Sequence, residues 1–492
     1  MTQAEGFHYT LSLPDPSSGS FIVELSCRNP PADTLELKMV RWSPGYYQIM
    51  DYALNLSDLQ ASDAAGRALE VISNTPGSWQ IVCGKKAFSV SYKISTGRRF
   101  VAENFVDSDH AYILPAASFL YAGQFLKEPV SLRVEMPQGW HDLATGLEEN
   151  PEKSKLYKAP NTDVLFDCPI LMGNLEDLPS FEVKGIKHRF TGYDMADFDR
   201  EALMDKLHQA IETATSLMGD IPYTEYTFIG IGQGFGGIEH QNSTAVSFTG
   251  EGLDDPQNML RTLSFLIHEY FHLYNVKRIR PFELGPFDYS RENRTNLLWV
   301  SEGLTVYYEY LILKRAGLMS EEQFFRSLAG HMEASENDPG RFYQSLAEAS
   351  YSTWSDGPFG QQGGDDRSIS VYDKGTCMGL ILDLAIRTGS GNSHSLDDVM
   401  RRLYSEYYQK QERGFTDAEF RQTCEEVAGV SLGDIFEYVY STAEPAYERY
   451  LSGAGLKLSI IQNKPGKTVR YSLTRTPNPD PQQQALIEDW LN

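Results

Sequence analysis

Two histidines and a glutamate in the segment LRTLSFLIHEYFHLYNVKRIR, residues 260–280, have the types and spacing of a metal-dependent hydrolase site. His268 and His272 are four residues apart, so on a helix both imidazoles lie on one face and can reach the same metal ion. Glu269 is rotated by about 100° from His268 and comes to lie beside that ion. This is the HExxH arrangement of zinc hydrolases. The alternative is a chance pairing of two histidines on a core helix.

A third metal ligand is predicted at Glu302, in the segment LLWVSEGLTVYYEYLILKRAG, residues 297–317. A catalytic zinc ion takes three protein ligands and keeps a fourth position for water, and the third ligand is often a glutamate. The apolar residues here recur at helical spacing, and Gly317 suits the end of a helix. A carboxylate among Trp299 and Leu304 would be costly to bury without a cation, and zinc would be that cation. The alternative is a surface glutamate on an amphipathic helix.

The remaining elements must position this trio, and the length of the chain indicates several domains. At 492 residues the chain is too long for one ordinary core, so two to four domains are expected. The 41% hydrophobic, 12% aromatic and 22% charged residues are typical of a folded protein. The net charge of −24 argues against a nucleic-acid partner, because phosphate contact needs basic surface.

The compartment is predicted from the N-terminus and the cysteines. The first twenty residues contain no basic region followed by an apolar one, and no stretch of about 18 apolar residues occurs anywhere. The five cysteines are scattered and form no CxxC pair, so we expect reduced core residues. We therefore expect a soluble cytoplasmic protein without a membrane partner. Removal of a signal peptide from the natural chain is left open.

The first third of the chain, residues 1–175, is predicted to be a β-rich N-terminal domain. Short segments of alternating hydrophobicity are separated by Pro, Gly, Asn and Asp, which is typical of a β-sandwich or a saddle-like sheet. The expected strands are YTLSL, FIVELSC, TLELKMV, WQIVCG, FSVSYKIS and VSLRVEM. Residues 41–55, RWSPGYYQIMDYALN, are unusually aromatic and could form either a core cluster or a wall of a substrate pocket.

The rest of the chain predicts an α+β multidomain protein. We expect a thermolysin-like catalytic domain at residues 176–318, opening with a helix from Phe198 to Met218. A mainly helical domain at residues 319–455 follows, with capping boxes that begin at Ser320 and Thr416. Within it, the Gly-rich stretch 355–368 is either a lid or a simple connection. Residues 456–492 are predicted to form a hairpin and a helix.

A series of glycines precedes the HExxH segment. It contains a formal GxGxxG from Gly232 to Gly237, but a dinucleotide site needs a helix directly afterwards, and IEHQNSTAVSF looks extended. Glycines such as Gly236 and Gly237 also let another backbone approach closely, as a strand edge that binds an extended peptide requires. Glu239 follows these glycines and is then placed to face a ligand.

Four segments together resemble the glycyl aminopeptidase family of gluzincin zinc metallopeptidases. They are GGIEHQNST, HEYFHLYNVKRIRP, LLWVSEGLTVYYE and VYDKGTCMGLILDLAIR, and the similarity spans roughly residues 8–455. The resemblance implies a β-rich N-terminal domain, a thermolysin-like catalytic domain and a helical domain. It also implies one zinc ion on His268, His272 and Glu302, with Glu269 as the general base.

The same resemblance implies roles for two further residues. Glu239 matches the acidic residue that binds the free amine of the substrate in related aminopeptidases. Tyr372 matches their tyrosine that donates a hydrogen bond to the oxyanion, although Val371 stands where a second tyrosine is usual. Members commonly carry a C-terminal PDZ-like domain, and the residues after Tyr450 are too few to build one.

The expected function is a zinc aminopeptidase that acts on peptides with a free N-terminus and prefers small first residues such as glycine or alanine. One alternative is an endopeptidase, or a hydrolase of another substrate on the same zinc. A second alternative is a catalytically silent peptide-binding protein that kept the fold. The sequence does not indicate an oligomeric state.

Overall fold

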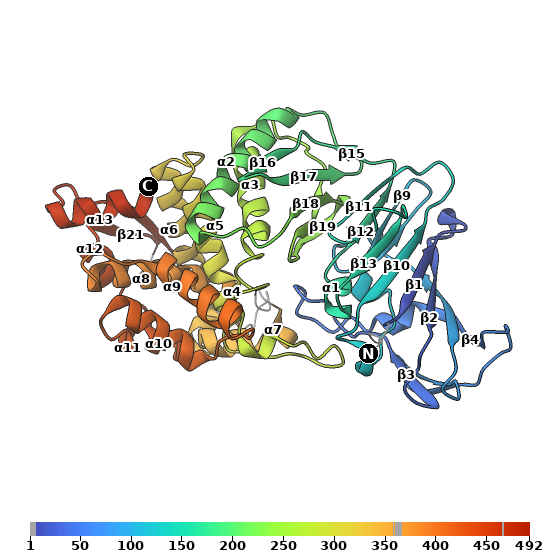
Figure 1. Cartoon of the computed structure of the whole chain (residues 1–492). Helices are drawn as coiled ribbons and strands as arrows, with labels where there is room; N and C mark the ends of the chain where they lie inside the picture. The colour runs from blue at the N-terminus through green and yellow to red at the C-terminus, as the bar shows by residue number, and fades with distance from the viewer. Residues whose placement is uncertain (1–5, 358, 360–366, 465–466) are drawn as a thin grey trace. The chain divides into compact units, whose positions relative to one another are not determined.

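The computed structural model describes residues 6–357, 359, 367–464 and 467–492 (Figure 1). Most of the predicted lid or connection at 355–368 lies outside these residues. The chain forms two compact units. The first unit comprises Met1–Glu201, Tyr223–Leu253 and Tyr289–Glu292, and the second comprises Ala202–Pro222, Asp254–Asp288 and Asn293–Asn492. The division into four domains predicted from the sequence stays a prediction.

The N-terminal part of the first unit is rich in strands, as the alternating sequence pattern predicted, and these strands form three sheets. A seven-stranded sheet has the order β12-β13-β10-β1-β2-β7-β4, a four-stranded sheet the order β11-β14-β9-β8, and a small sheet the order β3-β6-β5. Their strands are β1 (His8–Ser12), β2 (Ser20–Cys27), β3 (Thr34–Lys38), β4 (Leu56–Asp63), β5 (Val71–Thr75), β6 (Ser78–Val82), β7 (Phe88–Ser95), β8 (Phe105–Val106), β9 (His110–Ile113), β10 (Val130–Glu135), β11 (Asp142–Thr145), β12 (Glu148–Glu149), β13 (Leu156–Ala159) and β14 (Ile170–Gly173). The short helix α1 (Thr162–Phe166) connects β13 to β14.

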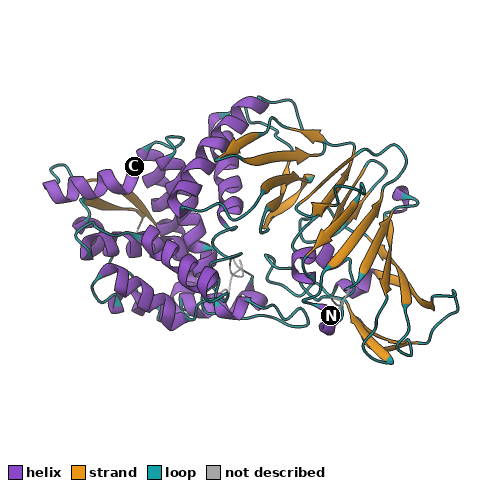
Figure 2. Cartoon of the chain, in the orientation of Figure 1, coloured by secondary structure: helices purple, strands orange, loops and turns teal. Residues whose placement is uncertain are grey.

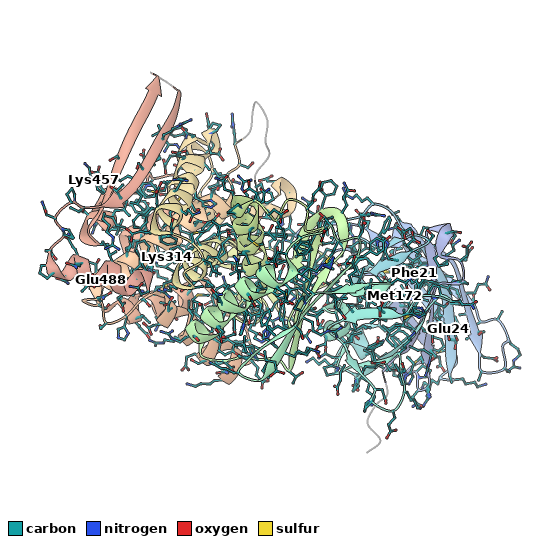
Figure 3. The ribbon with its side chains drawn as sticks, turned by 90° about the horizontal axis from the view of Figure 1, so that it is seen from above. Phe21, Glu24, Met172, Lys314, Lys457 and Glu488 are labelled. Atoms are coloured by element: carbon teal, nitrogen blue, oxygen red, sulfur yellow. The ribbon has the colours of Figure 1, made fainter. Side chains whose placement is uncertain are left out.

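The pairing of β2 with β7 shows how this core forms. Along each strand every second side chain is buried, and the buried residues of the two strands lie opposite one another. These residues are Phe21, Val23, Leu25 and Cys27 in β2, and Phe88, Val90, Tyr92 and Ile94 in β7. Phe21 is buried and Glu24 is exposed, as expected for residues an odd number of positions apart in one strand. Both residues are labelled in Figure 3.

A fourth sheet in the first unit precedes the HExxH segment. Its order is β15-β17-β18-β20-β19, with β16 paired to β17, so that β19 is an edge strand. The strands are β15 (Glu176–Asp177), β16 (Phe181–Val183), β17 (Ile186–Gly192), β18 (Glu225–Gly230), β19 (Gly232–Glu239) and β20 (Ser243–Phe248). The glycine series is thus a strand followed by another strand, which excludes the dinucleotide-binding alternative.

The second unit is mainly helical, as Figure 2 shows. Its helices are α2 (Arg200–Met218, whose first two residues belong to the first unit), α3 (Pro256–Phe271), α4 (Leu298–Ser301), α5 (Gly303–Arg315), α6 (Glu321–Asn337), α7 (Leu346–Asp356), α8 (Val371–Gly389), α9 (Leu396–Leu403), the π-helix η7 (Tyr404–Lys410), α10 (Asp417–Ala428), α11 (Gly433–Tyr440), α12 (Tyr447–Gly453) and α13 (Pro481–Leu491). The predicted capping boxes at Ser320 and Thr416 are both formed.

The predicted C-terminal hairpin and helix are also present in the second unit. The hairpin pairs β21 (Leu456–Lys464) with β22 (Lys467–Arg475). Trp490 of α13 is fully buried, and its indole N–H donates to the Tyr307 hydroxyl on α5 at 2.7 Å. The terminal helix therefore packs against the helix that begins directly after Glu302.

The predicted α+β class, with a β-rich N-terminal part and a helical part after it, is confirmed. All five cysteines are buried and free of disulfides, as their scattered positions predicted. Among the described residues, no helix is both long and apolar enough to cross a bilayer.

Candidate active site

The two histidines of the HExxH segment converge at the end of α3. The helix begins at Pro256, where the Asp255 side chain accepts hydrogen bonds from two backbone N–H groups of the first turn. His268 lies in the last turn, and His272 is the residue after the helix, still with helical dihedral angles (φ −58°, ψ −22°). The i, i+4 relation therefore holds, and the two Nε2 atoms are 3.0 Å apart.

Glu302 completes the group from the helical segment that the sequence predicted. It lies at the junction of α4 and α5 with helical dihedral angles (φ −93°, ψ −55°), and i→i−4 backbone hydrogen bonds run through it, from its N–H to the Leu298 carbonyl and from the Val306 N–H to its own carbonyl. Its Oε2 atom lies 3.4 Å from Nε2 of His272 and 3.8 Å from Nε2 of His268. The side chain is only 3% exposed. The packing of α5 against α3 places the carboxylate at the histidines.

The three side chains fit a zinc ion. In a tetrahedral site with bonds of about 2.1 Å, ligand atoms lie about 3.4 Å apart, and the observed separations bracket that value. Burial by itself would raise the pKa of Glu302, but His272 and His268 outweigh burial and lower it to about 2. The carboxylate is thus ionised. The arrangement of two imidazoles and one carboxylate is suited to a buried cation.

The outer nitrogen of each histidine is held by a second protein group. Nδ1 of His268 lies 2.9 Å from Oε2 of Glu309, whose other oxygen accepts a 2.7 Å hydrogen bond from the Ser264 hydroxyl. Nδ1 of His272 lies 2.8 Å from the carbonyl oxygen of Asn275. Such partners place the proton on Nδ1 and direct Nε2 at the metal. The sequence reasoning missed Glu309, although a separation of about two helical turns from Glu302 places both on one side of the segment.

The second unit also brings the predicted catalytic residues to this place. Glu269 is buried on α3 directly after His268. Tyr372 lies in the first turn of α8, and its ring centroid is 6.1 Å from that of His268. A pair of glycines lets α5 and α8 approach closely, since a Cβ atom on Gly375 would stand 2.8 Å from the Cα atom of Gly303. Those glycines follow Glu302 by one residue and Tyr372 by three.

The predicted substrate-binding residues belong to the first unit. Glu239 is the last residue of the edge strand β19 and is 4% exposed. A Cβ atom on Gly45, which has φ +88°, would lie 2.8 Å from a carboxylate oxygen of Glu239. One turn of the aromatic segment 41–55 therefore packs on this carboxylate, while Trp42 and Tyr52 of the same segment are buried in the core.

The glycines of β19 approach a segment of the same chain. A Cβ atom on Gly234 would stand 2.9 Å from the carbonyl oxygen of Arg99, and the Val101 N–H donates to the Phe235 carbonyl at 3.3 Å. At Gly236, with φ +82°, a Cβ atom would meet the Val101 side chain at 3.0 Å. At these two glycines the close neighbour is thus the chain itself. That Gly236 and Gly237 let the backbone of a bound peptide approach the edge strand stays a prediction.

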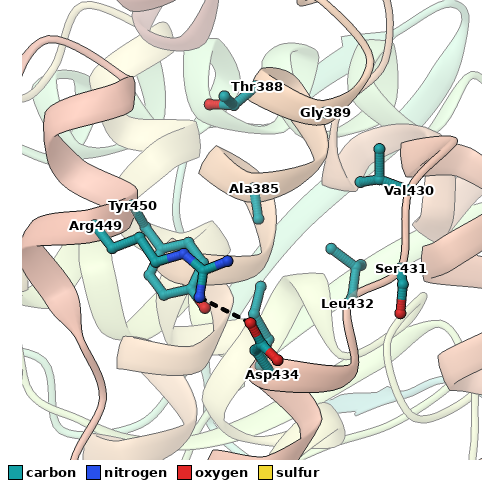
Figure 4. Close-up of a pocket in the computed structure, with 10 residues that line it drawn as sticks. Ala385, Thr388, Gly389, Val430, Ser431, Leu432, Asp434, Arg449 and Tyr450 are labelled. Carbon is teal, nitrogen blue, oxygen red and sulfur yellow. Dashed lines mark hydrogen bonds and ion pairs between the residues drawn. The ribbon is translucent and has the colours of Figure 1, made fainter.

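A separate cavity of about 230 Å³ lies within the second unit (Figure 4). It is formed by the end of α8, the connection between α10 and α11, α11 and α12. The ion pair between Arg449 and Asp434, at 2.8 Å, lies in its lining. The predicted site residues are not among those that line it.

Comparison with known proteins gives matches to one peptidase family. The family model of the peptidase M61 N-terminal domain matches residues 8–174, and that of the M61 glycyl aminopeptidase matches residues 261–378. An aminopeptidase N family protein from Idiomarina loihiensis is 27% identical with a TM-score of 0.86, and the match covers 92% of this chain and 79% of that one. No curated protein matches the chain.

More distant structures share the fold. An M1 zinc metallopeptidase from Deinococcus radiodurans, solved as a mutant bound to a Tyr-Ser-Ala substrate, is 13% identical with a TM-score of 0.54. That match covers 90% of this chain and 95% of the other. Legionella pneumophila aminopeptidase A, solved with aspartic acid, is also 13% identical with a TM-score of 0.54, over 96% of this chain and 52% of that one.

The fold, the family matches and the convergence of His268, His272 and Glu302 define a zinc metallopeptidase. Within that class, the chain belongs to the M61 glycyl aminopeptidase family. The coarser part of the predicted function, a zinc aminopeptidase acting on peptides, is supported by the same matches. These matches do not test the preference at the first residue.

Proposed function

We propose that this protein removes small N-terminal residues, such as glycine or alanine, from peptides with a free amino terminus, using one zinc ion. The observation that carries the proposal is the buried convergence of His268, His272 and Glu302, with each outer histidine nitrogen already held by the protein. The description of the family as glycyl aminopeptidases supports the preference for a small first residue.

In this proposal His268, His272 and Glu302 hold the zinc ion. When bound, zinc acts as a Lewis acid that polarises the scissile carbonyl and lowers the pKa of water. The Glu269 carboxylate accepts a proton from the attacking water and later delivers it to the leaving amine. The burial of Glu269 keeps bulk water away from that transfer.

Two further side chains complete the proposed roles. The Tyr372 hydroxyl donates a hydrogen bond to the carbonyl oxygen as negative charge develops there, and one such donor contributes about 3 kcal/mol. Glu239 accepts hydrogen bonds from the α-ammonium group of the substrate, and this contact places the first peptide bond of the substrate at the catalytic residues. The resemblance to aminopeptidases and the burial of this carboxylate support that role.

The experiment compares free and N-acetylated peptides that begin with Gly, Ala, Leu or Phe, with and without a chelator, and reads the products by mass spectrometry. We expect single residues to be released from free Gly and Ala peptides and the chelator to stop the reaction. Acetylation removes the charge that pairs with Glu239, and loss of a buried pair costs about 3 to 5 kcal/mol, so cleavage should fall at least a hundredfold.

Two variants test whether Glu239 causes the preference for a free N-terminus. Glu239→Gln should lose the preference for a free N-terminus, whereas Glu182→Gln, an exposed glutamate on β16 of the same unit, should retain it. Internal cleavage of both peptide forms would instead identify an endopeptidase. Failure of the zinc-loaded protein to cut any peptide would refute the peptidase proposal, and faster release of Leu or Phe would refute the preference for small residues.

A further inference from the structure

A histidine outside the metal site links two elements of that site. His331 lies near the middle of α6, and its two ring nitrogens contact different helices. Nδ1 is 2.7 Å from Oδ1 of Asp373 on α8, and Nε2 is 3.2 Å from the hydroxyl oxygen of Tyr310 on α5. The His331 side chain is 19% exposed and that of Asp373 is 29% exposed, so water screens this link only in part.

The two residues that His331 contacts, Asp373 and Tyr310, are each adjacent in sequence to a residue of the active site. Asp373 directly follows Tyr372 in the first turn of α8, where its backbone N–H donates to the Ser370 hydroxyl that caps the helix. Tyr310 directly follows Glu309, the residue that contacts Nδ1 of His268. Burial raises the pKa of the Tyr310 hydroxyl, and the nearby Glu309 carboxylate raises it further.

Histidine is suited to this position because its two nitrogens point away from each other. Each can be a donor or an acceptor, so one ring can join a carboxylate to a hydroxyl on another helix. With the Nδ1 proton directed at Asp373, Nε2 can accept the hydrogen of Tyr310. When that hydrogen is directed at the Glu309 carboxylate instead, a protonated His331 ring donates to both Asp373 and the Tyr310 oxygen. In either assignment the ring joins the two helices.

The contacts of His331 restrain the orientation of the first turn of α8, which the glycine contact between α5 and α8 does not do. Gly303 and Gly375 allow the two backbones to touch, but they have no side chains that would fix how the first turn of α8 is oriented. The contacts of His331 with Asp373 and with Tyr310 restrain the first turn of α8 at the residue next to Tyr372. Small displacements at this position matter, because a misplacement of about 1 Å can cost about a hundredfold in rate.

We propose that His331 is a positioning residue that holds the hydroxyl of Tyr372 in place for the reaction by joining Asp373 on α8 to Tyr310 on α5. The inference rests on the proposed role of Tyr372. It adds a residue that the sequence did not single out and that lies in neither the zinc ligands nor their direct contacts.

The test measures kcat, KM and zinc content for His331→Ala in two backgrounds, wild type and Tyr372→Phe. In the wild-type background kcat should fall about tenfold or more, with little change in KM or zinc content, because an oxyanion donor acts mainly in the transition state. In the Tyr372→Phe background the same substitution should change kcat by less than about twofold, since the group it positions is absent. His331→Gln, which keeps a side-chain donor and an acceptor, should recover part of kcat.

The control is His208→Ala on α2, which removes a partly exposed histidine that lies 3.5 Å from Glu212 and should not change kcat. An equal loss of kcat in both backgrounds would show that His331 supports the fold in general and would overturn the inference. Unchanged kcat in the wild-type background would overturn it as well. If Tyr372→Phe alone leaves kcat unchanged, the proposed role of Tyr372 is refuted. This outcome is distinct from those that overturn only the role of His331.

Discussion

Removing the Glu309 carboxylate should weaken zinc binding although this residue is not a ligand. It holds Nδ1 of His268 at 2.9 Å and also accepts the hydrogen bond of Ser264 at 2.7 Å, and all three side chains are buried. Loss of such an outer partner typically lowers metal affinity by about 10- to 100-fold, or about 1.4 to 2.8 kcal/mol. Because Glu309→Ala leaves two buried donors without their acceptor, we expect a loss near 100-fold.

Glu309→Gln tests the cause of that loss. The amide oxygen can still accept one of the two hydrogen bonds, but the negative charge beside His268 is gone, so we expect a loss of about tenfold. The zinc dissociation constant is measured by competition with a chromophoric chelator, and thermal melting of each apo-protein checks the fold. Glu322→Gln, an exposed glutamate on α6, is the matched control and should bind zinc like the wild type. A dissociation constant for Glu309→Ala within twofold of the wild-type value would refute the reasoning.

Two predictions concern residues that we propose to act on the metal or the substrate. Glu302→Ala should lose zinc at a chelator concentration at which Glu269→Gln remains loaded, because a ligand contributes directly to affinity and the base does not; elemental analysis showing equal zinc in both would remove Glu302 from the metal. Tyr372→Phe should lower kcat by about a hundredfold or more with little change in KM, and steady-state kinetics showing a raised KM at unchanged kcat would make Tyr372 a ground-state binding residue.

Local sequence determined much of the metal site. The relation between His268 and His272 depends only on helical periodicity, and it survives although α3 ends one residue before His272. Alternating apolar residues likewise predicted the strands of the N-terminal sheets, and Ser320 and Thr416 marked helix starts through contacts within one turn. In each case the interacting groups are a few residues apart, so a short window of sequence contains the whole interaction.

Tertiary structure decided what those local patterns are used for. The helical pattern around Glu302 predicted a helix, but only the packing of α5 against α3 brings the carboxylate to two histidines some thirty residues earlier. In the sequence, Glu309 has no feature that distinguishes it from other glutamates on an amphipathic helix. Its contact with His268 is formed only because α3 packs beside α5. His331 carried no signal at all, because its partners Tyr310 and Asp373 lie on two other helices. Such contacts depend on how helices pack, and packing is set by the whole core instead of by any one segment.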